Sequence, residues 1–163
     1  LRAMDYTQVS VKSLSGSGDA AKFLSFLKEE LFPLIEENYR TDTSRRMLMG
    51  SSFGGLFTLY AMLTEPDLFS GYVAASPAVS YAHGAMFDQE AEYAEQHQEL
   101  PVKLYLLVGE LEGLYKPVKK FMEVLKEHDY KGLKMETQIV QGEGHASNKP
   151  EGYNRGLRFI LQK

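Results

Sequence analysis

The chain has 163 residues, of which 44% are hydrophobic and 25% charged, values typical of a soluble globular protein with one domain. Its 18 basic and 22 acidic residues give a net charge of −4, which argues against a nucleic-acid-binding protein. The absence of cysteine excludes disulfides, zinc–thiolate sites and a cysteine nucleophile. The sequence contains no run of about 18 apolar residues, so it predicts no membrane span. Residues 1–6 lack the apolar stretch of a signal peptide.

The order of the predicted elements is that of an α/β protein. Residues 1–18 are small and polar and predict a loop, after which Asp19 is placed to cap a helix. In chain order we expect a helix over 19–39 that Pro33 kinks or splits, a strand over 46–50, a helix over 54–63, a strand over 71–75, a strand over 102–108, a helix over 115–128, a strand over 134–140 and a helix over 150–161. This alternation predicts one domain over 1–163 with a parallel sheet and helices on both of its faces.

Several segments also carry expectations about burial. The apolar run over 46–50 predicts a buried strand, and the helix over 54–63 is apolar nearly all round and should be buried too. The run over 102–108 is typical of a strand buried on both faces. Residues 81–100 carry many charges, which favours loop and short helix. Their acidic stretch is interpreted as a solvated face rather than a metal site: Asp88, Glu90, Glu92 and His97.

One motif points to chemistry. Directly after the first strand, Gly-Ser-Ser-Phe-Gly-Gly matches G-x-S-x-G centred on Ser52, between a predicted strand and a predicted helix. This is the pattern of a nucleophile elbow, in which Gly50 and Gly54 are small because strand and helix come close together. The Phe53 N–H would begin the helix and point at a developing oxyanion. The alternative interpretation is a glycine-rich turn without chemistry.

A serine nucleophile needs a base, and the base needs an orienting acid that comes between them in the chain. His145 follows the last strand in a Gly-Glu-Gly-His-Ala-Ser loop and is the candidate base. The loop after the strand over 102–108 offers Glu112 as the acid, because it lies further from the strand end. Glu110 is the alternative acid, and a serine–histidine dyad without an acid also stays open. The other histidines are interpreted as solvated: His83, His97 and His128.

Together these motifs resemble the putative-esterase family of α/β-hydrolases. The segments that carry the resemblance are residues 2–7, 50–63, 76–77, 108–112 and 142–145. The elbow and the histidine loop are most similar to the enterobactin and bacillibactin trilactone esterases, including the IroE-like enzymes. By matching position, the resemblance implies Ser52 as nucleophile, His145 as base and Glu112 as acid.

The resemblance implies a hydrolase that cleaves a carboxylic ester, such as a siderophore trilactone, through an acyl-enzyme. Its expected partner is a small-molecule ester, and neither a metal nor an organic cofactor is expected. Feruloyl, glutathione-thioester and mycolyl-transferring enzymes also belong to the family, so it defines the reaction better than the substrate. Two alternatives stay open: an acyltransferase with the same residues, and a catalytically silent binding module of the same fold.

The number of predicted strands is small for the fold that the resemblance implies. We find four strand candidates where an α/β-hydrolase has about eight, and in the family the first strands precede the segment at which this chain begins. We therefore expect the C-terminal half of an α/β-hydrolase domain. Its partner would be the missing N-terminal half of the same domain, which would cover an otherwise open edge of the first strand.

Overall fold

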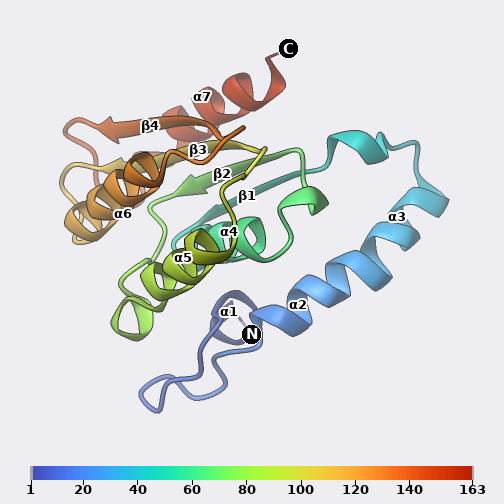
Figure 1. Cartoon of the computed structure of the whole chain (residues 1–163), viewed down its shortest axis with the longest axis horizontal. Coiled ribbons are helices and arrows are strands. Elements are labelled where there is room, and N and C mark those ends of the chain that lie inside the picture. The colour runs from blue at the N-terminus through green and yellow to red at the C-terminus, as the bar shows by residue number, and fades with distance from the viewer. Residues whose placement is uncertain (1, 163) are drawn as a thin grey trace.

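The computed structural model describes residues 2–162 and arranges them around one parallel sheet (Figure 1). The strands lie side by side in chain order: β1 (Met47–Ser51), β2 (Gly71–Ala75), β3 (Lys103–Gly109) and β4 (Lys134–Val140). Every pairing between neighbours is parallel, so the predicted fold class is confirmed. Leu1 and Lys163, which the predicted domain includes, lie outside the described residues.

Helices cover both faces of this sheet. The helices that follow the strands are α4 (Phe53–Thr64), α5 (Ala85–Gln96), α6 (Tyr115–His128) and α7 (Lys149–Leu161). Those before the sheet are α1 (Arg2–Tyr6), α2 (Ala20–Phe26) and α3 (Phe32–Asn38), and short 3-10 turns span Thr43–Arg45, Pro66–Leu68 and Tyr81–Gly84. Figure 1 shows α4, α5 and α6 on one side of the sheet and α7 on the other. None of the helices between residues 2 and 162 is both long and apolar enough to cross a membrane.

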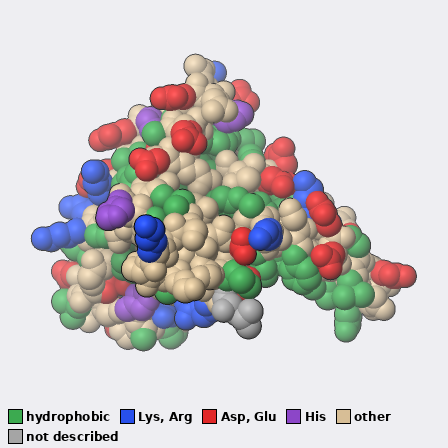
Figure 2. Space-filling model, turned by 90° about the horizontal axis from the view of Figure 1, so that it is seen from below, with side chains coloured by type: hydrophobic (Ala, Val, Ile, Leu, Met, Phe, Trp, Pro, Cys, Tyr) green, Lys and Arg blue, Asp and Glu red, His purple; other side chains and the backbone are tan. Residues whose placement is uncertain are grey.

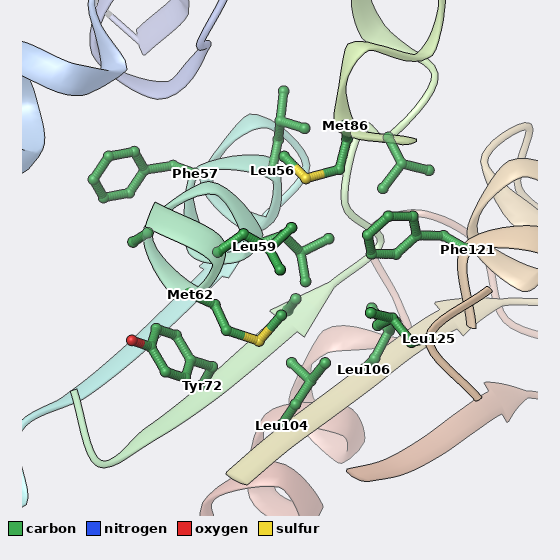
Figure 3. Close-up of a cluster of buried hydrophobic side chains, with 14 of the residues drawn as sticks. Leu56, Phe57, Leu59, Met62, Tyr72, Met86, Leu104, Leu106, Phe121 and Leu125 are labelled. Carbon is green, nitrogen blue, oxygen red and sulfur yellow. The ribbon is translucent and has the colours of Figure 1, made fainter. Parts of the chain in front are cut away.

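The main core lies between the sheet and α4, α5 and α6 (Figure 3). Leu104 and Leu106 of β3 point into it, whereas Tyr105 and Leu107 point to the smaller cluster under α7. The alternation follows from the two-residue period of a strand. It confirms that the strand predicted over 102–108 is buried on both faces.

The burial predicted for the first strand is wrong. Met47 and Met49 of β1 are 38% and 42% exposed. They share the face on which α7 contacts β2, β3 and β4, and β1 is paired only with β2 among the described residues. The sequence shows that the strand is apolar, but what covers it depends on its place at the end of the sheet.

The N-terminal segment also differs from the prediction. Residues 2–6, inside the loop predicted over 1–18, form α1, because Tyr6 packs on Phe23 and Phe57 with ring centroids 5.4 and 5.8 Å apart. Asp19 makes no side-chain cap to α2 and instead forms an ion pair with Lys22. A polar sequence does not show such tertiary contacts.

In the helix predicted over 19–39, a π-helical turn, Leu27–Leu31, joins α2 to α3 and ends two residues before Pro33. The residues at both junctions keep right-handed helical dihedrals, so the regular hydrogen bonding is interrupted but the helix is not split in two. Proline has no N–H for the regular helical ladder, which accounts for the irregular turn before it. Figure 1 shows this arm projecting from the sheet. Hydrophobic side chains are visible on it in Figure 2, and Leu34 and Tyr39 are 56% and 66% exposed.

Residues 85–96 form a regular helix, α5, where loop and short helix are predicted. The buried face of the helix carries Met86 and Tyr93, and between them the carboxylate of Glu90, which is 1% exposed. Glu90 accepts a hydrogen bond from the Tyr130 hydroxyl at 2.7 Å and lies 2.6 Å from His128 Nδ1. Burial and this carboxylate raise the pKa of Tyr130. Glu90 is therefore not solvated as predicted, whereas the His128 side chain is 39% exposed even though it contacts Glu90. Because a charged residue occupies a buried position of α5, the sequence does not show the apolar pattern of a helix.

Replacing Glu90 by alanine is expected to lower the free energy of unfolding by about 2–3 kcal/mol. The substitution leaves the Tyr130 hydroxyl and His128 Nδ1 without their acceptor. Urea unfolding followed by circular dichroism measures the change. Glu92→Ala, on the exposed side of the same helix, is the control and should stay within about 0.5 kcal/mol of the parent. Equal stability of the two variants would show that the buried carboxylate contributes nothing.

Candidate active site

Ser52 stands alone between a strand and a helix. β1 ends at Ser51 and α4 begins at Phe53, so that Ser52 makes the whole turn with φ 60° and ψ −119°. A non-glycine residue with positive φ is strained, and such strain is typical of a nucleophile elbow. Three backbone hydrogen bonds hold the turn: Ser52 N donates to Ala75 O at 3.0 Å, and Ser52 O accepts from Leu56 N at 2.9 Å and from Ala78 N at 3.1 Å.

The two glycines of the motif differ in their packing. A Cβ on Gly50 would lie 2.2 Å from Gly54 O and 2.8 Å from Thr58 Oγ1, so only glycine fits there. A Cβ on Gly54 would have no described atom within 4 Å outside its own helix backbone, which corrects the prediction that both glycines are needed for close packing. The close approach occurs at Gly55 instead, where a Cβ would lie 3.0 Å from Ala75 O. Successive helical residues point about 100° apart, so Gly55 rather than Gly54 faces the sheet.

The loops after β3 and β4 bring an acid and a base together. Glu112 Oε2 lies 2.5 Å from His145 Nδ1. The Glu112 side chain is 3% exposed and the imidazole is 42% exposed. Glu110, the alternative acid, points elsewhere, and its Oε2 accepts a hydrogen bond from Gly142 N at 2.9 Å. Of the two predicted carboxylates, Glu112 is the one that contacts the histidine.

Two further residues of this cluster were not singled out from the sequence. Ser76 Oγ donates to Glu112 Oε1 at 2.5 Å, and Asn148 Nδ2 donates to the same oxygen at 2.9 Å. Both residues are fully buried. Ser76 belongs to the Ser-Pro turn after β2 and Asn148 follows His145 by three residues, but no spacing in the sequence connects them to Glu112.

Ser52 and His145 lie at the same edge of the sheet. Ser52, Ser76, Glu112 and His145 follow β1, β2, β3 and β4 in turn, and parallel strands direct their carboxyl ends to one edge. No hydrogen bond between described residues joins the Ser52 hydroxyl to His145. Catalytic hydrogen bonds are often long without a substrate and tighten in its complex. Phe53 is the first residue of α4, so its N–H has no acceptor within the helix.

A cavity of about 760 Å³ lies beside the elbow. Residues 11–14, residues 80–83 and Phe53 line it. The rings of Phe53 and Tyr81 meet edge to face with centroids 5.4 Å apart, and the Tyr81 hydroxyl donates to Val9 O at 2.8 Å. His83, interpreted from the sequence as solvated, is exposed and is one of the residues that line this cavity.

A strained serine between strand and helix, with a histidine and an acid on the loops after later strands, is the arrangement of an α/β-hydrolase. The chain belongs to the family described as "Putative esterase", which matches residues 4–148. The resemblance predicted from the sequence is therefore confirmed.

Individual relatives agree with this assignment. The chain is 33% identical over 151 residues to the ferri-bacillibactin esterase BesA of Bacillus subtilis, a match that covers 88% of this chain and 52% of BesA. Its fold matches that of the BES protein from Bacillus cereus with a TM-score of 0.90 at 27% identity, over 99% of this chain and 66% of that one. An IroE-like serine hydrolase from Shewanella oneidensis matches with a TM-score of 0.85 at 25% identity, over 96% and 55% of the two chains. The chain thus spans about half the length of BesA.

Proposed function

We propose that this chain carries the catalytic residues of a serine hydrolase that cleaves carboxylic esters through an acyl-enzyme. The observation that carries the proposal is the 2.5 Å contact between Glu112 Oε2 and His145 Nδ1, at the sheet edge that also holds the strained turn of Ser52. Because a carboxylate can only accept a hydrogen bond, the contact keeps the proton on Nδ1 and leaves Nε2 free to act as a base.

In the proposed reaction, Ser52 Oγ attacks the ester carbonyl carbon while His145 Nε2 takes the hydroxyl proton. Glu112 stabilises the imidazolium, and the Phe53 N–H donates to the oxyanion of the tetrahedral intermediate. The intermediate collapses to an acyl-enzyme, and the alcohol leaves with the proton from His145. Water then attacks the acyl group by the same steps and restores Ser52.

A fluorophosphonate probe tests this proposal, because it forms a covalent adduct only with an activated serine. We expect a single adduct on Ser52, located by mass spectrometry of the digested protein. A folded chain that forms no adduct would instead be the catalytically silent binding module. Adding an acceptor alcohol to the turnover assay separates a hydrolase from an acyltransferase, since an acyltransferase passes the acyl group to the alcohol in preference to water.

We also propose a siderophore ester, such as a trilactone, as the substrate. The name of BesA supports this class, and so does the cavity beside Phe53, whose volume is within the range of about 300–1,000 Å³ usual for ligand sites. Tyr81 offers an aromatic wall, and Lys12 and His83 offer nitrogen groups for an acidic aromatic ester. Chromatography of a catecholate trilactone before and after incubation tests the substrate class. Turnover of p-nitrophenyl esters alone would favour another ester.

Finally, we propose that further strands of the same domain, from its N-terminal half, cover β1 in the complete protein. The exposed Met47 and Met49 and the 52% coverage of BesA support this proposal. Because both the unpaired edge of β1 and the exposed apolar side chains on its face favour association, the 163-residue chain alone should self-associate in light scattering. The double substitution Met47→Lys and Met49→Lys should reduce this association. A monodisperse monomer of the unaltered chain would contradict the proposal.

A further inference from the structure

The two oxygens of Glu112 have different partners. Among residues 2–162, Oε2 contacts only His145 Nδ1, whereas Oε1 accepts three hydrogen bonds, from Ser76 Oγ at 2.5 Å, Gly109 N at 2.7 Å and Asn148 Nδ2 at 2.9 Å. Asn148 Nδ2 also donates to Ser76 Oγ at 3.0 Å. Hydrogen bonds to a carboxylate favour its charged form and restrict its rotation. The arrangement therefore assigns one oxygen to the surrounding protein and the other to the imidazole.

Capping of α7 does not explain why an asparagine is buried at position 148. It occupies the N-cap position of α7, where asparagine usually caps the helix with its side chain, but this side chain makes no cap hydrogen bond. The residue is fully buried, and its Oδ1 has no hydrogen-bond partner among the described residues. A buried polar atom without a partner costs free energy. The hydrogen bonds from Nδ2 to Glu112 Oε1 and Ser76 Oγ are the feature that explains an amide at this position.

Ser76 is held in a costly backbone conformation. Its φ is 44°, a left-handed value that favours glycine, and the residue is fully buried. Its N–H donates to Leu107 O at 2.7 Å, which ties the turn after β2 to β3. Glycine would adopt this backbone conformation with less strain, but it would lack the hydroxyl that donates to Glu112.

The end of β3 leaves room for this cluster. A Cβ on Gly109 would lie 2.9 Å from Asn148 Nδ2 and 2.5 Å from Glu143 O. The loop that carries His145 therefore packs directly on the β3 backbone, and Leu111 N donates to Glu143 O at 3.0 Å. The acid and the base are fixed to each other through this packing as well as through their own contact.

We infer that Asn148 and Ser76 are positioning residues, which hold the Glu112 carboxylate so that Oε2 alone meets His145. This inference rests on the proposed function. Without the two donors only Gly109 N still donates to Oε1, so the carboxylate is held less firmly and stabilises the imidazolium less well. Neither residue contacts the reacting atoms, so the loss should lower kcat and leave KM nearly unchanged.

The inference is tested with Asn148→Ala and Ser76→Ala, each assayed for p-nitrophenyl ester turnover per serine titrated with fluorophosphonate. We expect kcat to fall about 10- to 100-fold in each variant, as for the loss of a hydrogen bond to a charged group, with KM within about 2-fold. In a Glu112→Ala background, Asn148→Ala should lower kcat no further, because its acceptor is already gone. Asn154→Ala, an exposed asparagine of the same helix, is the control and should match the parent.

A purely structural role for Asn148 would give a different result, since its effect would multiply with that of Glu112→Ala. Multiplied effects, or a kcat of either single variant equal to that of the parent, would overturn the inference. If the parent chain turns over no ester, the proposed function fails, and NMR of the His145 ring still decides the positioning role. Its Nδ1–H signal, assigned by its loss in His145→Gln, should shift in Asn148→Ala and in Ser76→Ala but not in Asn154→Ala. An unchanged signal in both would overturn the inference.

Discussion

Replacing Ser52 by alanine is expected to lower p-nitrophenyl ester turnover by about 10⁴- to 10⁶-fold. The acyl-enzyme cannot form without the hydroxyl, and only the oxyanion donor and substrate binding remain to assist water. The Ser52 hydroxyl makes no hydrogen bond with another described residue, so its removal should leave the urea unfolding curve unchanged. The measurement is the initial rate at saturating ester, normalised to the concentration of folded protein.

Ser51→Ala provides a matched control for this prediction. Ser51 is the last residue of β1, and its hydroxyl is buried and has no hydrogen-bond partner among the described residues. It therefore cannot act on a substrate, and its removal should change the rate by less than about 2-fold. A Ser52→Ala variant with the rate of the parent, or a large loss in Ser51→Ala alone, would show that the wrong serine was assigned.

The sheet was largely predictable because its strands are short apolar runs bounded by polar or glycine residues. The strands predicted over 71–75 and 134–140 coincide with β2 and β4, and the strand predicted over 102–108 is displaced from β3 by one residue. The helix over 115–128 coincides with α6, since its apolar residues recur with helical spacing.

The failures share a physical cause, namely contacts made across the fold. The length of α5 was missed because Glu90 occupies a buried position of its apolar face and is stabilised there by His128 and Tyr130, which lie about 40 residues later in the chain. The exposure of Met47 and Met49 depends on which helix covers which strand. Local sequence pattern contains neither fact.

The candidate site divides in the same way. Ser52 and His145 could be found because the elbow and the histidine loop have local motifs, and Glu112 because it follows the strand next to that loop. Ser76 and Asn148 could not be found, because they meet Glu112 only when β2, β3 and β4 lie side by side. The supporting residues of such a site are visible only after the strands have been placed in order.

Replacing Gly50 by alanine is expected to lower the free energy of unfolding by about 2–4 kcal/mol. The added Cβ would lie 2.2 Å from Gly54 O and 2.3 Å from its carbonyl carbon. Both atoms belong to the backbone of the first turn of α4, so no side-chain rotation relieves the clash and the helix must move away from β1. Because Ser52 makes the turn between the two elements, fluorophosphonate labelling should fall together with stability.

Gly54→Ala separates this steric cause from a general intolerance of the motif. Its Cβ would meet no described atom within 4 Å outside its own helix backbone, and alanine has the higher helix propensity. The free energy of unfolding should therefore stay the same or rise by up to about 1 kcal/mol. If Gly54→Ala destabilises the chain as much as Gly50→Ala does, both glycines of G-x-S-x-G serve packing and the distinction drawn from the structure is wrong. If only Gly50→Ala destabilises the chain, the close approach of β1 and α4 requires glycine at position 50 alone.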